Sequence, residues 1–184
     1  MADLLWERGY AATSPRDVLA RADVGQGSMY HHFTGKRDLA VHALQAVTAE
    51  VTAESELLDG EGTPLERMVR YLTRPREATR GCRVGRMTQD PDVVEDAELI
   101  SLVAGAFDII IERWRRVIVE AIAAHELPES LVPGDLAHAL VAVIQGGYVL
   151  SRAQGTKEPM DSAIRGALAL LDARHRGRSK DEAQ

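Results

Sequence analysis

Polar side chains of types that bind phosphates and base edges gather between residues 13 and 36. They include hydroxyl, amide, imidazole and cationic groups, and a glycine among them lets the backbone approach a ligand closely. Glutamine suits an adenine edge, and lysine or arginine suits a phosphate oxygen. We predict that a nucleic acid contacts Thr13, Ser14, Arg16, Gln26, Gly27, Ser28, Tyr30, His31 and Lys36.

The sequence around these residues predicts two short helices joined by a tight turn. Ser14-Pro15-Arg16-Asp17 is typical of a helix start, because Ser caps, Pro needs no N–H partner and Asp completes a capping box. Asp23-Val24-Gly25 then breaks the helix, since Asp and Gly tolerate turn conformations. We expect a second short helix from about Gln26 to Phe33 and a long helix from about Lys36, capped by Thr34.

The second short helix has an apolar side and a polar side when it is wound at helical periodicity. Met29 and Phe33 share one side and are expected to pack on Val18, Leu19 and Val24. The predicted contact residues lie around the other side. A helix-turn-helix holds one helix to its neighbour in this way and leaves its outer side free to enter a major groove. The sequence therefore predicts binding to double-stranded DNA.

The segments GYAATS and DVGQGSMYHHFTGKRDL resemble the DNA-binding domain of the TetR family of transcriptional regulators. That family has G-[YF]-x-x-[TS] before the first helix of the motif, G-[TS]-[LMF]-Y-x-[HY]-F in the recognition helix, and a Lys at the start of the fourth helix. The resemblance covers roughly Leu4 to Leu44. It implies an all-α fold: an N-terminal three-helix helix-turn-helix DNA-binding domain and a C-terminal helical domain for ligand binding and dimerisation.

The resemblance also implies a function. It indicates a ligand-responsive transcriptional regulator, most often a repressor, that binds a palindromic operator as a homodimer and responds to an unidentified small-molecule effector. The alternative is a helical small-molecule sensor or partner-binding protein that does not bind DNA. The sequence departs from the family pattern at Asp23, where Gly is usual, and at Gly25, where Ser is common. The first helix, Ala2 to Arg8, is shorter than usual and is predicted to be truncated.

The charge distribution is compatible with DNA binding, although the whole chain has a formal net charge of −6. Residues 1–45 contain five basic and five acidic side chains and therefore have no net charge. The remaining residues contain 17 basic and 23 acidic side chains. The acidity thus lies outside the predicted DNA-binding face, and the local field matters more for binding than the total charge.

The chain of 184 residues is expected to contain a DNA-binding domain at 1–45, a ligand-binding and dimerisation domain at 46–175, and a disordered tail at 176–184. Within the second domain, the sequence predicts a charged surface connection at Arg74–Arg80 and a long helix from Asp92 to about Glu126. Aromatic residues make up only 4% of the chain, so aliphatic side chains must fill most of the core.

The last two predicted helices, which begin near Asp135 and Met160, have broad apolar faces with small residues that permit close packing. In the TetR family these helices of two subunits form a four-helix interface, so the resemblance implies a homodimer. The interface is expected to include Leu140, Ile144, Gly147, Ile164, Ala167, Leu168 and Leu171. The alternative is that these faces pack against each other inside one chain.

Large apolar residues of the middle helices are candidates for the lining of an effector pocket. They are Met68, Leu72, Met87, Phe107, Ile110, Trp114 and Tyr148, with Gln145 and Arg113 as polar anchors. Apolar residues at helical spacing are also the ordinary pattern of a core, so that alternative stays open.

Other kinds of site have little support in the sequence. His31 and His32 point about 100° apart on a helix and have no third ligand nearby, so no metal site is predicted. No catalytic constellation or cofactor motif is present, so we expect neither enzyme activity nor a cofactor. Cys82 is expected to be a packed thiol, with a redox switch as the alternative. We expect a cytoplasmic protein without a membrane segment, since no apolar run approaches roughly 18 residues.

Overall fold

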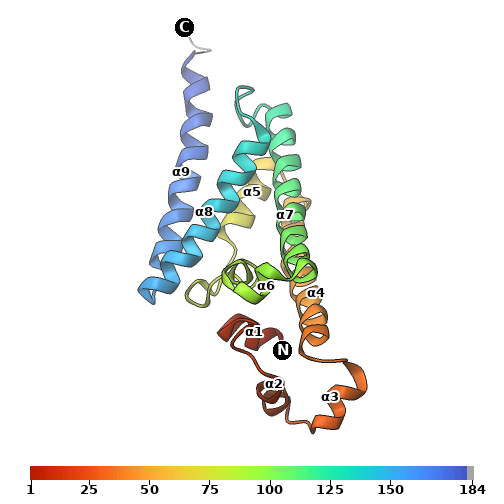
Figure 1. Ribbon diagram of the computed structural model, residues 1–184. Coiled ribbons are helices and arrows are strands. Elements are labelled where there is room, and N and C mark those ends of the chain that lie inside the picture. The colour runs from red at the N-terminus through yellow and green to blue at the C-terminus, as the bar shows by residue number, and fades with distance from the viewer. Residues whose placement is uncertain (182–184) are drawn as a thin grey trace. The chain divides into compact units, whose positions relative to one another are not determined.

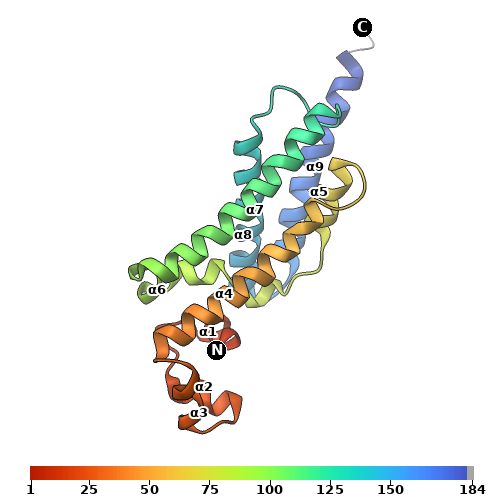
Figure 2. The ribbon, with the colours of Figure 1, turned by 90° about the vertical axis from the view of Figure 1, so that its right-hand side faces the viewer.

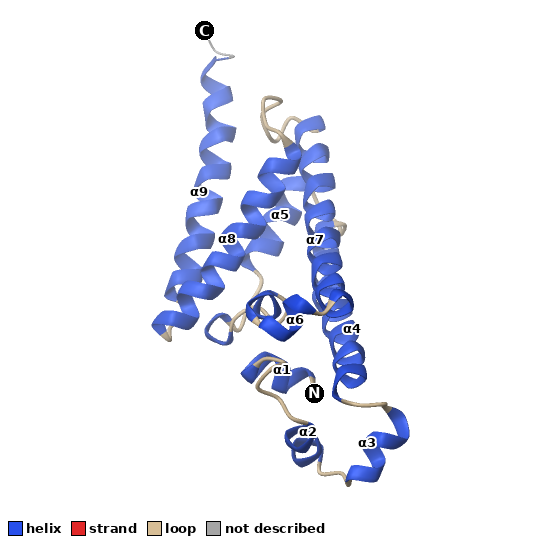
Figure 3. Cartoon of the chain, viewed as in Figure 1, coloured by secondary structure: helices blue, strands red, loops and turns tan. Residues whose placement is uncertain are grey.

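The chain folds into helices joined by turns, with no strand among the residues that the structure describes (Figure 3). The computed structural model describes the backbone of residues 1–181, and within this range it leaves the side chains of residues 26, 28, 30 and 173–181 undescribed. The α-helices are α1 (Ala2–Arg8), α2 (Pro15–Ala22), α3 (Gln26–His32), α4 (Lys36–Glu54), α5 (Pro64–Thr73), α6 (Pro91–Glu95), α7 (Ala97–Ala123), α8 (Pro133–Gln154) and α9 (Glu158–Asp181). The 3-10 helices are η1 (Ser55–Leu58), η2 (Ala78–Arg80) and η3 (Gly85–Gln89). The predicted all-α fold is confirmed.

The chain divides into two compact units, and neither is continuous in sequence. The first contains Met1–Ala53 and Cys82–Phe107, and the second contains Glu54–Gly81 and Asp108–Gln184. The first unit is therefore larger than the DNA-binding domain that the sequence indicates at residues 1–45. Helix α7 contributes its first residues to the first unit and the others to the second.

A shared apolar core explains why a segment far along the chain belongs to the first unit. Leu5 of α1 packs with Ala40 and Leu44 of α4. The same cluster includes buried side chains of the later segment, namely Val84, Met87, Val93, Leu99, Val103 and Ala106. Burial of this apolar surface holds together segments that are distant in sequence.

The single helix predicted from Asp92 to Glu126 is in fact two helices, α6 and α7, because Asp96 interrupts it. The backbone of Asp96 is extended, with φ −91° and ψ 110°. Its carboxylate accepts hydrogen bonds from the N–H groups of Glu98 at 3.0 Å and Leu99 at 3.1 Å. Asp96 therefore satisfies two of the free N–H groups at the start of α7, as helix caps do.

In the second unit, α8 and α9 lie side by side (Figures 1 and 2). Gly147 permits their close approach, because a Cβ added there would lie 2.7 Å from Sδ of Met160. The buried Ser151 hydroxyl accepts a hydrogen bond from the Met160 N–H at 3.0 Å. This contact joins the end of one helix to the start of the next.

Most of the residues predicted to form the dimer interface are buried within one chain. Those buried in the single chain are Leu140, Ile144, Gly147, Ile164, Ala167 and Leu171, and Leu168 is half-buried. These side chains therefore offer little surface to a second copy, and their place in a dimer interface stays a prediction. Their burial agrees with the alternative, in which these faces pack against each other inside one chain.

Two further observations concern the expectations about the last helices. By length and composition alone, α8 is long and apolar enough to cross a membrane, and it is the one such helix in the described part of the chain. It packs against α9 within the second unit. Helix α9 continues to Asp181, so residues 176–181 of the predicted disordered tail are helical. Residues 182–184 of that tail lie outside the described residues.

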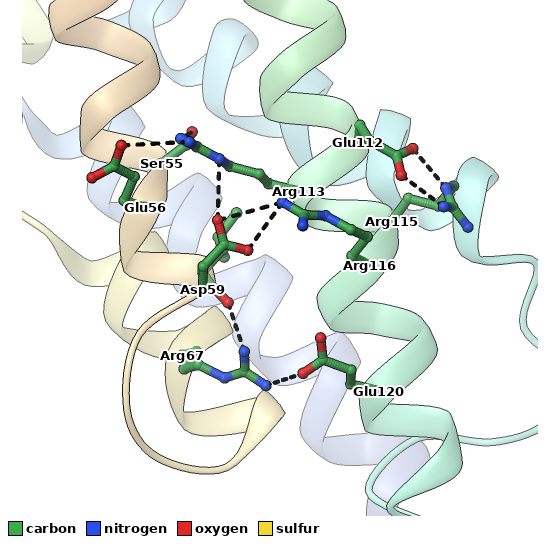
Figure 4. A network of polar contacts seen from close by, with 10 residues as sticks. Ser55, Glu56, Asp59, Arg67, Glu112, Arg113, Arg115, Arg116 and Glu120 are labelled. Carbon is green, nitrogen blue, oxygen red and sulfur yellow. Dashed lines mark hydrogen bonds and ion pairs between the residues drawn. The ribbon is translucent and has the colours of Figure 1, made fainter.

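A polar network joins the end of η1 to α5 and α7 within the second unit (Figure 4). Arg113 donates to the Ser55 hydroxyl at 2.6 Å, and its Nε lies 3.2 Å from a carboxylate oxygen of Asp59. Arg67 of α5 pairs with Glu120 of α7. Arg113, predicted as a polar anchor for an effector, is therefore engaged in holding these helices together.

Candidate nucleic-acid interface

Helices α2 and α3 form the predicted helix-turn-helix. Ser14 and Asp17 make a complete capping box at the start of α2, and Pro15 is its first residue. Asp23 ends α2 in the left-handed conformation, with φ 53° and ψ 45°. Gly25 precedes α3 with an extended backbone and no side-chain cap. The turn therefore forms although residue 23 is not glycine, because Asp tolerates this conformation better than most residues.

Apolar packing fixes the inner side of α3. Met29 is 5% exposed and packs in one cluster with Leu4 and Val18, and Phe33 packs against the same cluster. Val24 is 43% exposed, so the prediction that it joins this packing is wrong. Helix α3 is thus held from one side only.

The predicted contact residues differ in accessibility. Arg16, Gly27 and His31 are exposed, and Lys36 is half-buried. Three others lie on α3 with side chains outside the described part of the structure, namely Gln26, Ser28 and Tyr30. Their roles stay predictions.

Internal hydrogen bonds engage the hydroxyl groups of Thr13 and Ser14. Thr13 is 1% exposed, and its hydroxyl donates to the carbonyl oxygen of Gly9 at 2.6 Å. Ser14 accepts from the Asp17 N–H at 3.3 Å and donates to the Asp17 carboxylate. The Ser14 hydroxyl and the Ser14 N–H both donate to the Asp17 carboxylate and lower the pKa of Asp17. The Thr13 side chain is therefore not available to a phosphate, and the Ser14 hydroxyl serves as a helix cap.

Ion pairs neutralise most of the basic side chains in residues 1–45. The pairs are Arg8 with Asp17, Arg21 with Glu7, and Arg37 with Asp96 and Glu98. Among the described residues, no carboxylate lies within salt-bridge distance of Arg16 or Lys36. These two cations stand at the starts of α2 and α4, next to the two ends of the motif. They are the charges of this region that remain available to phosphate.

Lys36 has a defined position. Its Nζ lies 4.2 Å from the centroid of the Tyr10 ring and 3.5 Å from the carbonyl oxygen of Ala11. Burial, followed by the nearby charge of Asp96, raises the pKa of Tyr10, so the phenol stays neutral near pH 7. The cation–π contact holds the ammonium group at the N-terminal end of α4, where helix N–H groups also favour an anion.

Asp90 fixes the backbone of Tyr10 and Ala11, the two residues that the Lys36 ammonium group contacts. It is 8% exposed, and its Oδ2 accepts hydrogen bonds from the N–H groups of Tyr10 at 2.6 Å and Ala11 at 2.9 Å. Gly9 makes room for this contact, since its φ is +88° and a Cβ there would lie 2.6 Å from the same oxygen. Sequence reasoning missed Asp90, because the sequence Asp90-Pro91 indicates only a turn and its partners are about 80 residues away.

The predicted effector residues belong to both units. Met87 and Phe107 lie in the first unit. The members in the second unit are Met68, Leu72, Ile110 and Trp114, which are buried, and Gln145 and Tyr148, which are half-buried. The second-unit members remain candidates for an effector site within that unit.

The connection predicted to lie on the surface contains two largely buried arginines. The side chain of Arg74 is 16% exposed and pairs with Glu54 at 2.6 Å. Arg76 donates to the carbonyl oxygens of Leu72 at 2.6 Å and Tyr71 at 2.7 Å. The prediction of a surface segment is wrong at these positions, because Arg76 caps the C-terminal carbonyl groups of α5.

The histidines of α3 and Cys82 are the groups considered for metal binding or thiol chemistry. The His31 and His32 rings lie 4.8 Å apart. Within the described residues, no group of three or more His, Cys, Asp or Glu side chains could hold a metal ion. Cys82 is half-buried, and its Sγ accepts a hydrogen bond from the Gly85 N–H at 3.2 Å.

Two family profiles match this chain. Residues 2–43 match the profile described as bacterial regulatory proteins of the tetR family. Residues 62–167 match the tetracyclin repressor-like C-terminal domain. The chain belongs to the TetR family. The resemblance and the N-terminal and C-terminal organisation that it implies are thus confirmed.

Similar proteins agree with this membership. The HTH-type transcriptional repressor DhaR of Mycobacterium sp. (strain GP1) is 27% identical over 162 residues, which cover 86% of this chain and 81% of DhaR. The regulatory protein TetR from Rhodobacter sphaeroides is 25% identical with a TM-score of 0.77, covering 90% of this chain and 92% of that one. The reduced form of E. coli NemR has a TM-score of 0.75 at 23% identity, over 90% of both chains, and shows the shared fold.

Family membership sets the function class. The protein is a DNA-binding transcriptional regulator, and it is not an enzyme. The exposed side of α3, flanked in sequence by Arg16 and Lys36, is its candidate surface for DNA.

Proposed function

We propose that this TetR-family regulator is a repressor that binds a palindromic operator as a homodimer and releases it when a small-molecule effector binds in the second unit. DhaR is named a repressor, which supports this sign of regulation. The observation that supports the DNA contact most strongly is the pair of cations without carboxylate partners, Arg16 and Lys36, at the two ends of the motif.

Helix α3 is proposed to enter the major groove. Its base-reading residues are Gln26, Ser28, Tyr30 and His31. Gly27 is exposed, and a Cβ added there would meet nothing within 4 Å, so the backbone has free space on that side. Arg16 and Lys36 are proposed to bind phosphates and to fix the register of α3 on the duplex.

A dimer is proposed because two recognition helices must meet successive major grooves, about 34–36 Å apart. The exposed apolar side chains of α8 and α9 are the candidates for the interface. They are Val149, Leu150 and Leu170, which are 67%, 52% and 69% exposed. Burial of such side chains against a second copy would remove apolar surface from water.

The effector is proposed to act by binding two states of the protein with different affinity, because only such a difference can change operator affinity. Operator DNA in bacteria lies in the cytoplasm, so we propose that the regulator works there.

The DNA face can be tested by fluorescence anisotropy on an operator selected from a random DNA pool. We expect Lys36→Ala to weaken operator binding at least about tenfold. It should also reduce by about one the slope of the logarithm of the binding constant against the logarithm of salt concentration. Tyr30→Ala should weaken binding on the selected operator more than on random DNA. The control is Arg21→Ala, which breaks only an exposed pair with Glu7 and should bind like the parent.

The binding of these variants and of the parent decides whether the proposed DNA face is correct. If Tyr30→Ala and Lys36→Ala both bind the operator like the parent, the assigned face is wrong. If the parent enriches no sequence at all, the alternative of a helical sensor or partner-binding protein without DNA binding is favoured.

A further inference from the structure

Two arginines and two aromatic rings meet at the end of α5 in the second unit. The guanidinium carbons of Arg74 and Arg76 lie 4.9 Å and 5.5 Å from the centroid of the Tyr71 ring. On α7, the Trp114 ring meets the Tyr71 ring edge to face, with centroids 5.4 Å apart. Tyr71 is 3% exposed and Trp114 is 0% exposed. The cluster therefore combines buried aromatic surface with two positive charges.

The positive charge of this cluster exceeds its negative charge. Glu54 pairs with Arg74 and is itself 48% exposed. Among the described residues, no carboxylate lies within salt-bridge distance of Arg76. Burial and the neighbouring Arg74 lower the pKa of Arg76. Arg76 donates to carbonyl oxygens, which carry no full negative charge, so a bound anion would stabilise this arrangement further.

The same cluster contains buried hydrogen-bond donors without partners. They are Nε of Arg74, Nε of Arg76 and Nε1 of Trp114, each inaccessible and without an acceptor in the described structure. Native proteins rarely leave such donors unpaired, and each unpaired donor calls for an explanation such as a ligand. The other nitrogens of Arg76 already bind the carbonyl oxygens that end α5, so its Nε is the donor left over.

We propose that this cluster is the effector site and that the effector is a carboxylate with an aromatic or short aliphatic body. A carboxylate has two oxygens with several acceptor positions, which match guanidinium and indole donors. Because Tyr71 and Trp114 are buried, the body of the effector would reach their apolar surfaces only when the side chains that cover them move aside. The inference rests on the proposed function, since it names the chemical class of the effector that the regulator binds.

The test uses tryptophan emission. The chain has two tryptophans, and Trp6 lies in the first unit, so a Trp6→Phe background leaves Trp114 as the reporter. The probes are benzoate and hexanoate, with the neutral benzamide and hexanamide as controls of the same shape. We expect a saturable change of emission with at least one of the acids, and binding of its amide at least about tenfold weaker.

Variants locate the site. Arg74→Gln and Arg76→Lys should each weaken binding of the acid by roughly tenfold, because each loses a charge-assisted hydrogen bond. The matched control is Arg83→Gln in the first unit. Arg83 is also half-buried, pairs with a glutamate, Glu50, at 2.5 Å and lies over an aromatic ring, that of Trp6. This control should bind the acid like the Trp6→Phe parent.

The outcomes separate this inference from the proposed function. Circular dichroism first shows that each variant is folded. If neither acid binds the Trp6→Phe parent, or if folded Arg74→Gln and Arg76→Lys bind it unchanged, the inference is overturned, whatever the operator affinity. Operator binding, measured on the same proteins without acid, tests the proposed function independently. If the acid releases the operator from the parent but not from Arg74→Gln, the result would support both the inference and the proposed function.

Discussion

Asp90 should contribute strongly to the stability of the first unit and to the position of Lys36, and replacing it tests both. Its Oδ2 accepts the N–H groups of both Tyr10 and Ala11, and Lys36 rests on the ring of Tyr10 and the carbonyl group of Ala11. Asp90→Ala removes the acceptor and leaves two N–H groups that are partly shielded from water. We expect it to lower both the stability of the protein and its affinity for the operator.

The magnitude follows from the number and kind of bonds. A hydrogen bond to a charged group contributes about 1.5–3 kcal/mol, and water can reach the exposed Ala11, so we take the lower end for each bond. Asp90→Ala should then cost about 3 kcal/mol of unfolding free energy. Because both N–H groups donate to one oxygen, the amide oxygen of Asp90→Asn can accept both. The substitution loses the charge and also places an amide NH2 where Oδ1 is buried without a partner, so it should cost less than Asp90→Ala by the hydrogen bonds that it keeps.

Urea unfolding followed by circular dichroism measures these free energies. The control is Asp92→Ala, an exposed acid in the first turn of α6, which should cost less than about 1 kcal/mol. The contacts described for Asp90 would be refuted if Asp90→Ala cost under about 0.5 kcal/mol, or if Asp90→Asn were as damaging as Asp90→Ala.

Three further results are expected. Gly147→Ala should destabilise the protein by about 1–3 kcal/mol in thermal unfolding, because its Cβ would lie 2.7 Å from Sδ and 3.3 Å from the Cα of Met160; an unchanged melting temperature would contradict this packing. The hydrogen bond from Arg37 lowers the pKa of Asp96 to about 2, so its contribution to stability is present above about pH 4 and is lost as the pH falls towards 2. Unfolding curves of the parent and Asp96→Asn should therefore differ at pH 6 and converge near pH 2, and a constant difference would argue against the pair. Arg16→Ala should weaken operator binding similarly for all sequences and lower the salt slope by about one, whereas a change in sequence preference would assign Arg16 to a base.

Local chemistry made the helix-turn-helix predictable. The capping box of Ser14 and Asp17, the proline between them and the left-handed Asp23 all act within a few residues of the chain. Their effects can therefore be read without knowledge of the fold. The packing of Met29 was predictable for the same reason, because helical periodicity alone places it on the inner side.

Long-range contacts were not predictable. Asp90 binds a turn about 80 residues earlier, and Arg37 pairs with Asp96 about 59 residues later, and neither contact has a local sequence pattern. These contacts belong to the first unit and join residues 82–107 to it. Sequence reasoning alone therefore drew the domain boundary at residue 45.

Apolar and charged patterns were also open to more than one interpretation. The apolar stripes that include Ile144 on α8 and Ile164 on α9 have the same spacing whether they face a second copy or a neighbouring helix, and both residues are buried within the single chain. Arg74 and Arg76 stand in a charged run that predicts a solvated surface. Arginine can bury its stem and use its guanidinium group to cap a helix end, which a residue-type pattern does not reveal.

The central claim is that the outer side of α3 reads DNA as part of a dimer. The most direct measurement is selection of bound sequences from a random double-stranded DNA pool with the purified full chain at moderate salt. We predict enrichment of a palindrome whose half-sites are centred about one helical turn, or a multiple of it, apart. Enrichment of no sequence, or of single half-sites without symmetry, would contradict the claim.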